Sequence, residues 1–255
     1  MDKAQYIIDW LTSYAEKANS NGFVVGISGG IDSALTSVLC AETRKKVFLL
    51  NMPIRQTEAE YSRSQKHILD LKQRYKNVSS YEINLTDVFS SFEKLMPINI
   101  EENMLAMANS RSRLRMTTLY AVAQANGFLV AGTGNKVEDF GVGFFTKYGD
   151  GGVDLSPIAD LYKTEVFAMA RKLNVIQEIL IAEPTDGLWA DGRSDEDQIG
   201  ATYPELEWAM DYLKLDKQEQ LSERQKEVIE IYLKFHSANQ HKMIPIPVCT
   251  FPESN

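Results

Sequence analysis

The stretch Gly26-Ile-Ser-Gly-Gly-Ile-Asp-Ser33 follows the apolar run Phe23-Val-Val25 and precedes a segment with helical spacing. A short buried strand is therefore expected to run into a glycine-rich turn, and the turn to open a helix. Gly29 lacks a Cβ atom, so an anion can approach the backbone closely there. The first amides of a helix have no partner within it, and the helix dipole adds positive potential. The stretch predicts a phosphate-binding loop.

Asp32 is the unusual member of this loop. A carboxylate among phosphate ligands is repulsive unless a cation bridges it, and oxygen-only ligation of that kind suits Mg²⁺. Ser28 and Ser33 add hydroxyl donors, whereas the lysine of an ordinary P-loop is absent. The loop resembles instead the pyrophosphate loop of the N-type ATP pyrophosphatases. Those enzymes split ATP between its α- and β-phosphates and adenylate an acceptor.

The rest of the chain alternates strands with helices. Apolar runs predict strands at 23–27, 47–50, 80–83 and 128–131. Helical spacing predicts helices at 3–18, 33–42, 57–76, 85–95, 101–124, 161–173 and through most of 206–236. This order predicts an α/β fold with a doubly wound, mainly parallel sheet and flanking helices. We expect a single domain over 1–255, in which 206–255 form a mostly helical tail.

Ligands of such sheets sit at the carboxyl ends of the strands, so the loops after Ile27, Leu50 and Ala131 should share one crevice. Residues 132–160 hold seven glycines and show little periodicity. A stretch of that length is expected to be a functional loop. Within it, Glu138 could give Mg²⁺ a second carboxylate, or it could be an ordinary exposed acid. Residues 183–200 are also expected to be irregular.

Composition excludes several classes of protein. The net charge of −8 argues against a general nucleic-acid surface. No apolar run approaches the roughly 18 residues of a membrane span, and residues 1–10 lack the core of a signal peptide. With only Cys40 and Cys249, no disulfide framework is indicated. We therefore expect a cytoplasmic protein that binds neither nucleic acid nor a membrane.

Several further stretches carry a resemblance to one family. They are 109–116, 132–138, 144–154, 157–163, 183–185 and 241–242, of which the run Phe145-Thr-Lys-Tyr-Gly-Asp-Gly151 is the most specific. Over nearly its whole length the chain resembles the NAD synthetase family. The resemblance implies an adenine nucleotide alpha hydrolase-like fold and a homodimer. It also favours the ammonia-dependent form, since there is no room for the amidase domain of the glutamine-dependent form.

The resemblance implies a role for each matching position. The residues implied to contact ATP are Gly26, Ile27, Ser28, Gly29, Gly30, Ile31, Asp32, Ser33, Thr133, Lys163 and Thr185. Those implied to contact deamido-NAD⁺ are Arg113, Lys147, Asp154, His241 and Lys242. Asp32 and Glu138 would hold Mg²⁺. The catalytic residues would be Asp32, Lys163 and Asp150, which would accept a proton from ammonium.

Some of these positions have ordinary alternatives. Arg113 could belong to a solvated helix face, and Lys163 could be exposed unless the start of its helix faces ATP. Lys147 stands nine positions after Glu138, one more than is common in the family. One residue must then be absorbed around 139–143, and either Glu138 or Asp139 could meet the metal. We favour Glu138, which aligns with the preceding Gly-Thr.

The implied reaction has two steps. The nicotinate carboxylate of deamido-NAD⁺ attacks the α-phosphorus of ATP and releases pyrophosphate, and ammonia then displaces AMP to give NAD⁺. The protein would position the reactants and stabilise charge. Because water competes with ammonia for the adenylate, we expect the glycine-rich loop at 141–152 to close over the site.

Two other readings of the sequence remain. One is another adenylating ATP pyrophosphatase, either GMP synthetase-like or tRNA-thiolating. A thiolating enzyme would need cysteines near the crevice, and a tRNA substrate would prefer a basic surface. The other is a nucleotide-binding regulator without catalysis, which need not keep both carboxylates and the residues for a second substrate. Their joint presence favours an enzyme.

Overall fold

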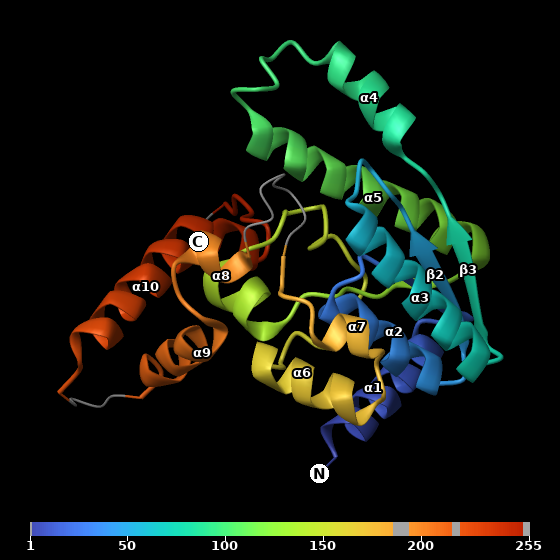
Figure 1. Ribbon diagram of the computed structural model, residues 1–255, viewed down its shortest axis with the longest axis horizontal. Helices are drawn as coiled ribbons and strands as arrows, with labels where there is room; N and C mark the ends of the chain where they lie inside the picture. The colour runs from blue at the N-terminus through green and yellow to red at the C-terminus, as the bar shows by residue number, and fades with distance from the viewer. Residues whose placement is uncertain (1, 186–193, 216–219, 252–255) are drawn as a thin grey trace.

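The centre of the protein is a four-stranded parallel sheet with the strand order β3-β2-β1-β4. The computed structural model in Figure 1 describes residues 2–185, 194–215 and 220–251. The strands are β1 (Gly22–Gly26), β2 (Lys46–Asn51), β3 (Val78–Glu82) and β4 (Leu129–Val130). This order confirms the predicted doubly wound sheet. The strand order changes direction at β1, because β2 and β3 lie on one side of it and β4 lies on the other, so the ligand crevice of such a sheet opens between β1 and β4.

Helices cover both faces of the sheet (Figure 1). One face carries α1 (Lys3–Lys17), α2 (Ile31–Glu42), α3 (Glu58–Arg74), α6 (Lys163–Lys172) and α7 (Gln177–Leu180). The other carries α5 (Met104–Asn126), with α4 (Thr86–Leu95) beside it. Alternate residues of β1 enter the two cores: Phe23 and Val25 pack with α2, and Val24 packs with α5. Burial on both faces explains why β1 and β2 contain continuous apolar runs.

A helical lobe extends from the sheet and contains α8 (Asp195–Ile199), α9 (Tyr203–Tyr212) and α10 (Glu223–Met243). These helices pack around a π-helix, η1 (Lys136–Val142), whose Val137 and Val142 are fully buried with Leu206 and Val228. Most of α9 and all of α10 lie in the stretch 206–255, and α10 runs beyond residue 236. Of the helices that the structure describes, none is both long and apolar enough to cross a membrane.

Two expectations about irregular segments were wrong in part. Residues 132–160 contain η1, and 183–200 contain α8, although 186–193 of that stretch lie outside the described residues. Both helices are shorter than the window over which helical periodicity can be recognised. Burial of η1 against α9 and α10 is a tertiary contact that local spacing does not reveal.

Candidate functional site

The predicted phosphate loop connects β1 to α2. Ser28 Oγ lies 3.1 Å from Ser33 Oγ and accepts a hydrogen bond from the Gly30 amide at 3.2 Å. Gly29 has a φ of +90°, and a Cβ atom there would lie 2.6 Å from the carbonyl oxygen of Glu60, so only glycine fits. No side chain caps the start of α2. The first amides of this helix are thus left for an anion.

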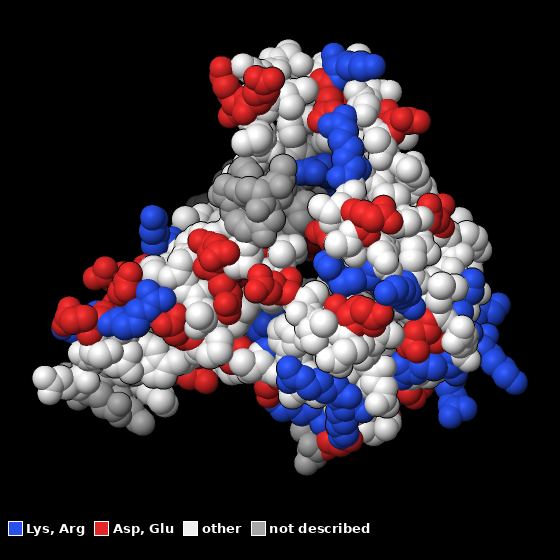
Figure 2. Space-filling model, in the orientation of Figure 1, with Lys and Arg blue, Asp and Glu red and all other residues white. Residues whose placement is uncertain are grey.

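The loop opens into a cavity of about 880 Å³. As predicted, the segments after β1, β2 and β4 meet there, and they are joined by parts of α3, α5, η1 and α10. Figure 2 shows basic side chains beside the central hollow of the molecule, over α3 and α5. Among the predicted site residues, those that line the cavity are residues 26–33, Arg113, Thr133, Glu138, Lys147, Asp150, Lys163, Thr185, His241 and Lys242.

Lys163 joins the two carboxylates that were predicted to hold a metal. It is the first residue of α6 and is only 3% exposed, so the start of that helix does face the cavity. Its Nζ donates to Asp32 Oδ2 at 2.6 Å and to Glu138 Oε1 at 2.8 Å. Asp139 does not join this cluster, because its carboxylate packs against Gly134, where a Cβ atom would lie 1.9 Å from Oδ2. The geometry supports Glu138 over Asp139 as the partner of Asp32.

Burial and pairing act in opposite directions on these groups. Burial lowers the pKa of Lys163, but the adjacent carboxylates of Asp32 and Glu138 more than offset it, and the net shift is upward. Burial raises the pKa of Asp32, and the charge of Glu138 adds to that rise. The pKa of Glu138 falls despite its burial, because it accepts hydrogen bonds from Lys163 and Tyr203. Lys163 is therefore a protonated cation held between carboxyl groups.

Asp32 and Glu138 have the chemistry of a Mg²⁺ site. Both present carboxylate oxygens to one point, which the Lys163 ammonium now occupies. Within the described residues, no group of three or more His, Cys, Asp or Glu side chains is arranged to hold a metal. Mg²⁺ commonly binds through one or two carboxylates together with phosphate oxygens and water. The two residues therefore fit a metal that arrives with a nucleotide.

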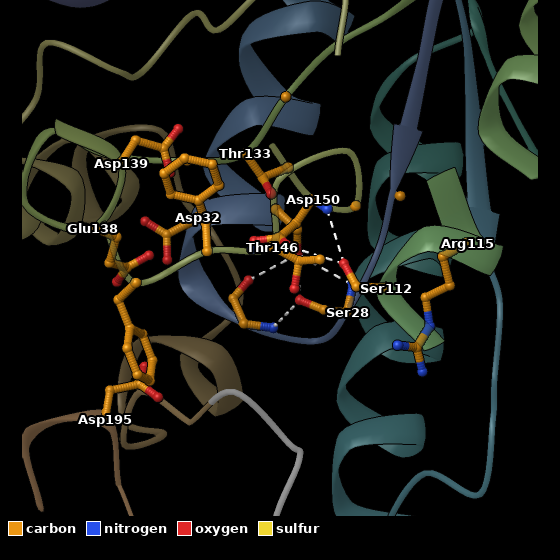
Figure 3. Close-up of a pocket in the computed structure, with 18 of the residues that line it drawn as sticks. Ser28, Asp32, Ser112, Arg115, Thr133, Glu138, Asp139, Thr146, Asp150 and Asp195 are labelled. Atoms are coloured by element: carbon orange, nitrogen blue, oxygen red, sulfur yellow. Dashed lines mark hydrogen bonds between the residues drawn. The ribbon is translucent and has the colours of Figure 1, made fainter. Parts of the chain in front are cut away.

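The loop around Asp150 bonds α5 on one side and α10 on the other, and Figure 3 shows Asp150 beside Ser112 and Thr146. Asp150 Oδ1 accepts hydrogen bonds from Ser112 Oγ of α5 at 2.8 Å and from the Thr146 amide at 2.9 Å. From α10, Lys242 Nζ donates to the Phe145 carbonyl at 2.8 Å. Burial raises the pKa of Asp150. The loop thus lies at the cavity, and its Asp150 has hydrogen bonds at one of its two carboxylate oxygens.

Asp154 is the one predicted site residue that does not line the cavity. Its Oδ2 accepts a hydrogen bond from the Val130 amide of β4 at 2.8 Å, and its Oδ1 accepts one from the Tyr120 hydroxyl at 3.1 Å. These bonds tie the segment after the Asp150 loop to the sheet. A contact between Asp154 and deamido-NAD⁺ stays a prediction and would have to be made outside this cavity.

Other residues of the site were not identified from the sequence. Tyr203 of α9 donates to Glu138 Oε1 at 2.6 Å, and no local pattern indicated this contact. Asn135 caps η1 and donates to Asp32 Oδ1 at 3.0 Å. It belongs to the stretch 132–138, so the family resemblance was a signal for it. Arg63 and Arg115 also line the cavity. Figure 3 shows Arg115 on the side opposite Asp32 and Glu138.

Comparisons with known proteins agree with this geometry. A family model described as NAD synthase matches residues 3–245. The chain is similar to the NH(3)-dependent NAD(+) synthetase of Mesoplasma florum, with 39% identity over 79% of this chain and 81% of that one. It is also similar to the NH(3)-dependent NAD(+) synthetase of Sulfurisphaera tokodaii, with 36% identity over 94% and 85%.

Two solved structures resemble the whole fold. One is an NMN synthetase from Francisella tularensis, which has a TM-score of 0.86 and 30% identity and covers 98% of each chain. The other is an NH3-dependent NAD synthetase from Campylobacter jejuni. It has a TM-score of 0.80 and 25% identity, and the match covers 98% of this chain and 100% of that one.

Proposed function

This chain belongs to the NAD synthase family, and on that premise we propose that it amidates deamido-NAD⁺ with ammonia in an ATP-dependent reaction. The products are NAD⁺, AMP and pyrophosphate. The observation that carries the proposal is the meeting of Asp32, Glu138 and Lys163 beside the loop at 26–33. A nucleotide regulator would have no need of this charged cluster next to its phosphate loop.

The first step joins the nicotinate carboxylate to the α-phosphorus of ATP. The free amides at the start of α2 and the hydroxyls of Ser28 and Ser33 bind the phosphates. Asp32 and Glu138 would hold Mg²⁺, which supplies charge neutralisation to the phosphate oxygens when it is bound. Lys163 is protonated and already at the cavity wall, so its ammonium group is placed to stabilise the charge that develops on the phosphoryl group.

The second step requires ammonia rather than ammonium. Asp150 Oδ2 has no hydrogen-bond partner among the described residues, while Oδ1 is held by Ser112 and Thr146. A carboxylate with a raised pKa is a better proton acceptor near neutral pH. Asp150 takes a proton from ammonium, and the resulting ammonia attacks the carbonyl carbon of the adenylate and displaces AMP. Closure of the loop around Asp150 would exclude competing water.

The second substrate would occupy the part of the cavity away from the phosphate loop. Arg113, Lys147, His241 and Lys242 all line the cavity, and Arg113 Nε donates to the Lys147 carbonyl at 3.3 Å. Lys147 Nζ donates to the His241 carbonyl at 2.7 Å, so α10 and the loop meet there. Basic side chains in this position suit the phosphates of deamido-NAD⁺.

The similarity to an NMN synthetase supports a second candidate reaction. In that reaction the acceptor would be nicotinate mononucleotide, which is amidated by the same chemistry. The two candidates differ only in whether the acceptor carries the adenylyl half of the dinucleotide.

Turnover of the purified protein tests both candidates. The protein is supplied with ATP and Mg²⁺, with deamido-NAD⁺ or nicotinate mononucleotide as acceptor, and with ammonium or glutamine as nitrogen donor. NAD⁺ and AMP formed in equal amounts with ammonium alone would support the proposal. Higher kcat/KM with the mononucleotide would favour the second candidate. Absence of both products from a folded, ATP-binding protein would point to another adenylating reaction.

Three accompanying properties are also proposals. The metal is Mg²⁺, because the site offers only oxygen ligands. The protein is a homodimer, since apolar side chains of Phe92, Leu95, Met104 and Leu105 are exposed along α4 and the start of α5. Its location is the cytoplasm, where two unpaired cysteines are stable. Sedimentation velocity tests the dimer directly.

A further inference from the structure

Three arginines of the cavity share one arrangement. Each donates from Nε to a backbone carbonyl: Arg63 to Gly29 at 3.2 Å, Arg113 to Lys147 at 3.3 Å and Arg115 to Met52 at 3.0 Å. Across residues 2–185, 194–215 and 220–251, none of the three forms an ion pair with a carboxylate. The side chains are thus anchored at Nε, and their terminal amino groups remain available at the cavity wall.

Arginines without a carboxylate partner are unexpected beside so many acids. The chain has 35 Asp and Glu residues against 27 Lys and Arg residues, and three other arginines, Arg55, Arg74 and Arg224, form ion pairs with carboxylates. A guanidinium fork anchored at one end presents two parallel donors, which match a phosphate group. A guanidinium that is held in this way therefore suits an anion that is supplied from outside the chain.

Among these three arginines, Arg63 is the one that bonds a residue of the loop at 26–33. Its own anchor is Gly29, and the helix that carries it packs so closely that a Cβ on Gly29 would lie 3.5 Å from Arg63 Cβ. Lys163 approaches the same loop through Asp32, but its ammonium is shared by two carboxylates. The loop also lacks the lysine with which an ordinary P-loop binds the β- and γ-phosphates. Arg63 is thus an arginine that is bonded to the loop itself and could bind these phosphates in addition to Mg²⁺.

We propose that Arg63 binds the β- and γ-phosphates of ATP and then the pyrophosphate that leaves. This assignment rests on the proposed function for its substrate. In the first step a bond forms between the nicotinate carboxylate oxygen and the α-phosphorus, and the bond from that phosphorus to the α,β-bridging oxygen breaks. The electron pair passes to pyrophosphate, and Arg63 stabilises the charge that develops there.

The test compares ligands that contain the β-phosphate with one that does not. Binding of pyrophosphate, ATP and AMP is measured by calorimetry in buffer with Mg²⁺, for the wild type and for Arg63→Gln and Arg63→Lys. Arg63→Gln should weaken pyrophosphate and ATP binding about tenfold or more, with AMP binding unchanged. Arg63→Lys keeps a point charge without the fork and should recover part of this loss.

A control separates this role from a structural one. Lys66→Gln removes a cation of the same helix that pairs with Glu178 on the surface, at 3.0 Å, and should leave all three affinities unchanged. If Arg63→Gln weakened AMP and pyrophosphate binding equally, Arg63 would only shape the loop, and the proposal would be wrong. Unchanged pyrophosphate binding in Arg63→Gln would also overturn it. Because these are binding measurements, they stand even if no amidation is found.

Discussion

Lys163 is a cation in an unfavourable place, at the first position of a helix whose dipole opposes it. It is also almost fully buried, and an isolated buried ammonium is strongly destabilising. Asp32 and Glu138 compensate by direct hydrogen bonds. At the scale of single residues, the Lys163 cation thus neutralises part of the charge of two carboxylates at the place where a metal is expected.

Replacing Lys163 with Met should upset this balance. The variant leaves two adjacent buried carboxylates without a cation, so we expect the free energy of unfolding to fall by about 3 kcal/mol in EDTA. Mg²⁺ without nucleotide should restore part of the loss in Lys163→Met and change the wild type little. Thermal unfolding with and without Mg²⁺ measures this, with the exposed Lys172→Met as control. An equal response of all three proteins would contradict the shared site.

Removing Asp32 should affect catalysis and leave the fold intact. In Asp32→Ala, Lys163 still pairs with Glu138, so the buried charges remain balanced. We expect turnover to fall by about 100-fold or more, because a metal ligand beside the phosphates is lost. The melting temperature and circular dichroism spectrum should stay close to those of the wild type. Turnover like that of the wild type would remove Asp32 from the metal site.

At the scale of elements, the loop at 144–152 depends on the helices on either side. The Ser112 hydroxyl of α5 makes two hydrogen bonds with Asp150. It donates to Asp150 Oδ1 and accepts from the Asp150 amide, and both bonds are 2.8 Å long. Gly149 packs against the same serine, since a Cβ atom there would lie 2.3 Å from Ser112 Oγ. The serine therefore holds the loop near the cavity when no substrate is bound.

Ser112→Ala should loosen this loop. Without substrates we expect faster tryptic cleavage after Lys147 than in the wild type, because two hydrogen bonds are lost. ATP and deamido-NAD⁺ together should slow cleavage in both proteins if the loop closes. Ser110→Ala is the matched control, since within the described part of the chain that hydroxyl bonds only the Ala106 carbonyl of its own helix. Cleavage that is the same with and without substrates would argue against closure.

The π-helix η1 accounts for one more feature at this scale. The family resemblance predicts one extra residue between Glu138 and Lys147, and η1 (Lys136–Val142) covers most of the segment 139–143 that would absorb it. A π-helical turn holds one residue more than an α-helical turn, and such turns are frequent at functional sites. Glu138 of this π-helix bonds the same Lys163 ammonium as Asp32 does.

At the scale of the whole molecule, folding stability should depend on a buried histidine. His67 of α3 is fully buried and its Nε2 lies 2.9 Å from Ser37 Oγ of α2, so it joins two helices of one core. Burial lowers the pKa of His67 from its ordinary value of 6.5 to about 4. The unfolded chain then takes up a proton at a higher pH than the folded protein does.

The sign of the effect follows from this difference. As the pH falls from 6.5 to about 4, the unfolded state binds the proton first, so His67 should lower the free energy of unfolding by about 1.4 kcal/mol per pH unit. Denaturant unfolding across this range should show a flatter pH dependence in His67→Gln than in the wild type. The exposed His241→Gln should follow the wild type. Parallel curves for all three would contradict the assignment.

Much of the sheet could be predicted from the sequence, and the reason is local. The strands around Phe23 and Val47 are short apolar runs, and each is followed by a helix, so their type and parallel order follow from the alternation. Their boundaries moved by a few residues, as in the last strand, which shortened to Leu129–Val130. Strand ends depend on pairing with neighbours, and pairing is not a local property.

The sequence by itself determined the glycine-rich turn at 26–33, the doubly wound sheet and the family, because glycine spacing and apolar periodicity act between near neighbours. Only the tertiary structure decided that Lys163 bridges Asp32 and Glu138, that Tyr203 joins them, and that Asp154 turns to the sheet. The contacts of Lys163 span 131 and 25 positions of the chain. They arise from the packing of helices around the crevice, and no local pattern encodes that packing.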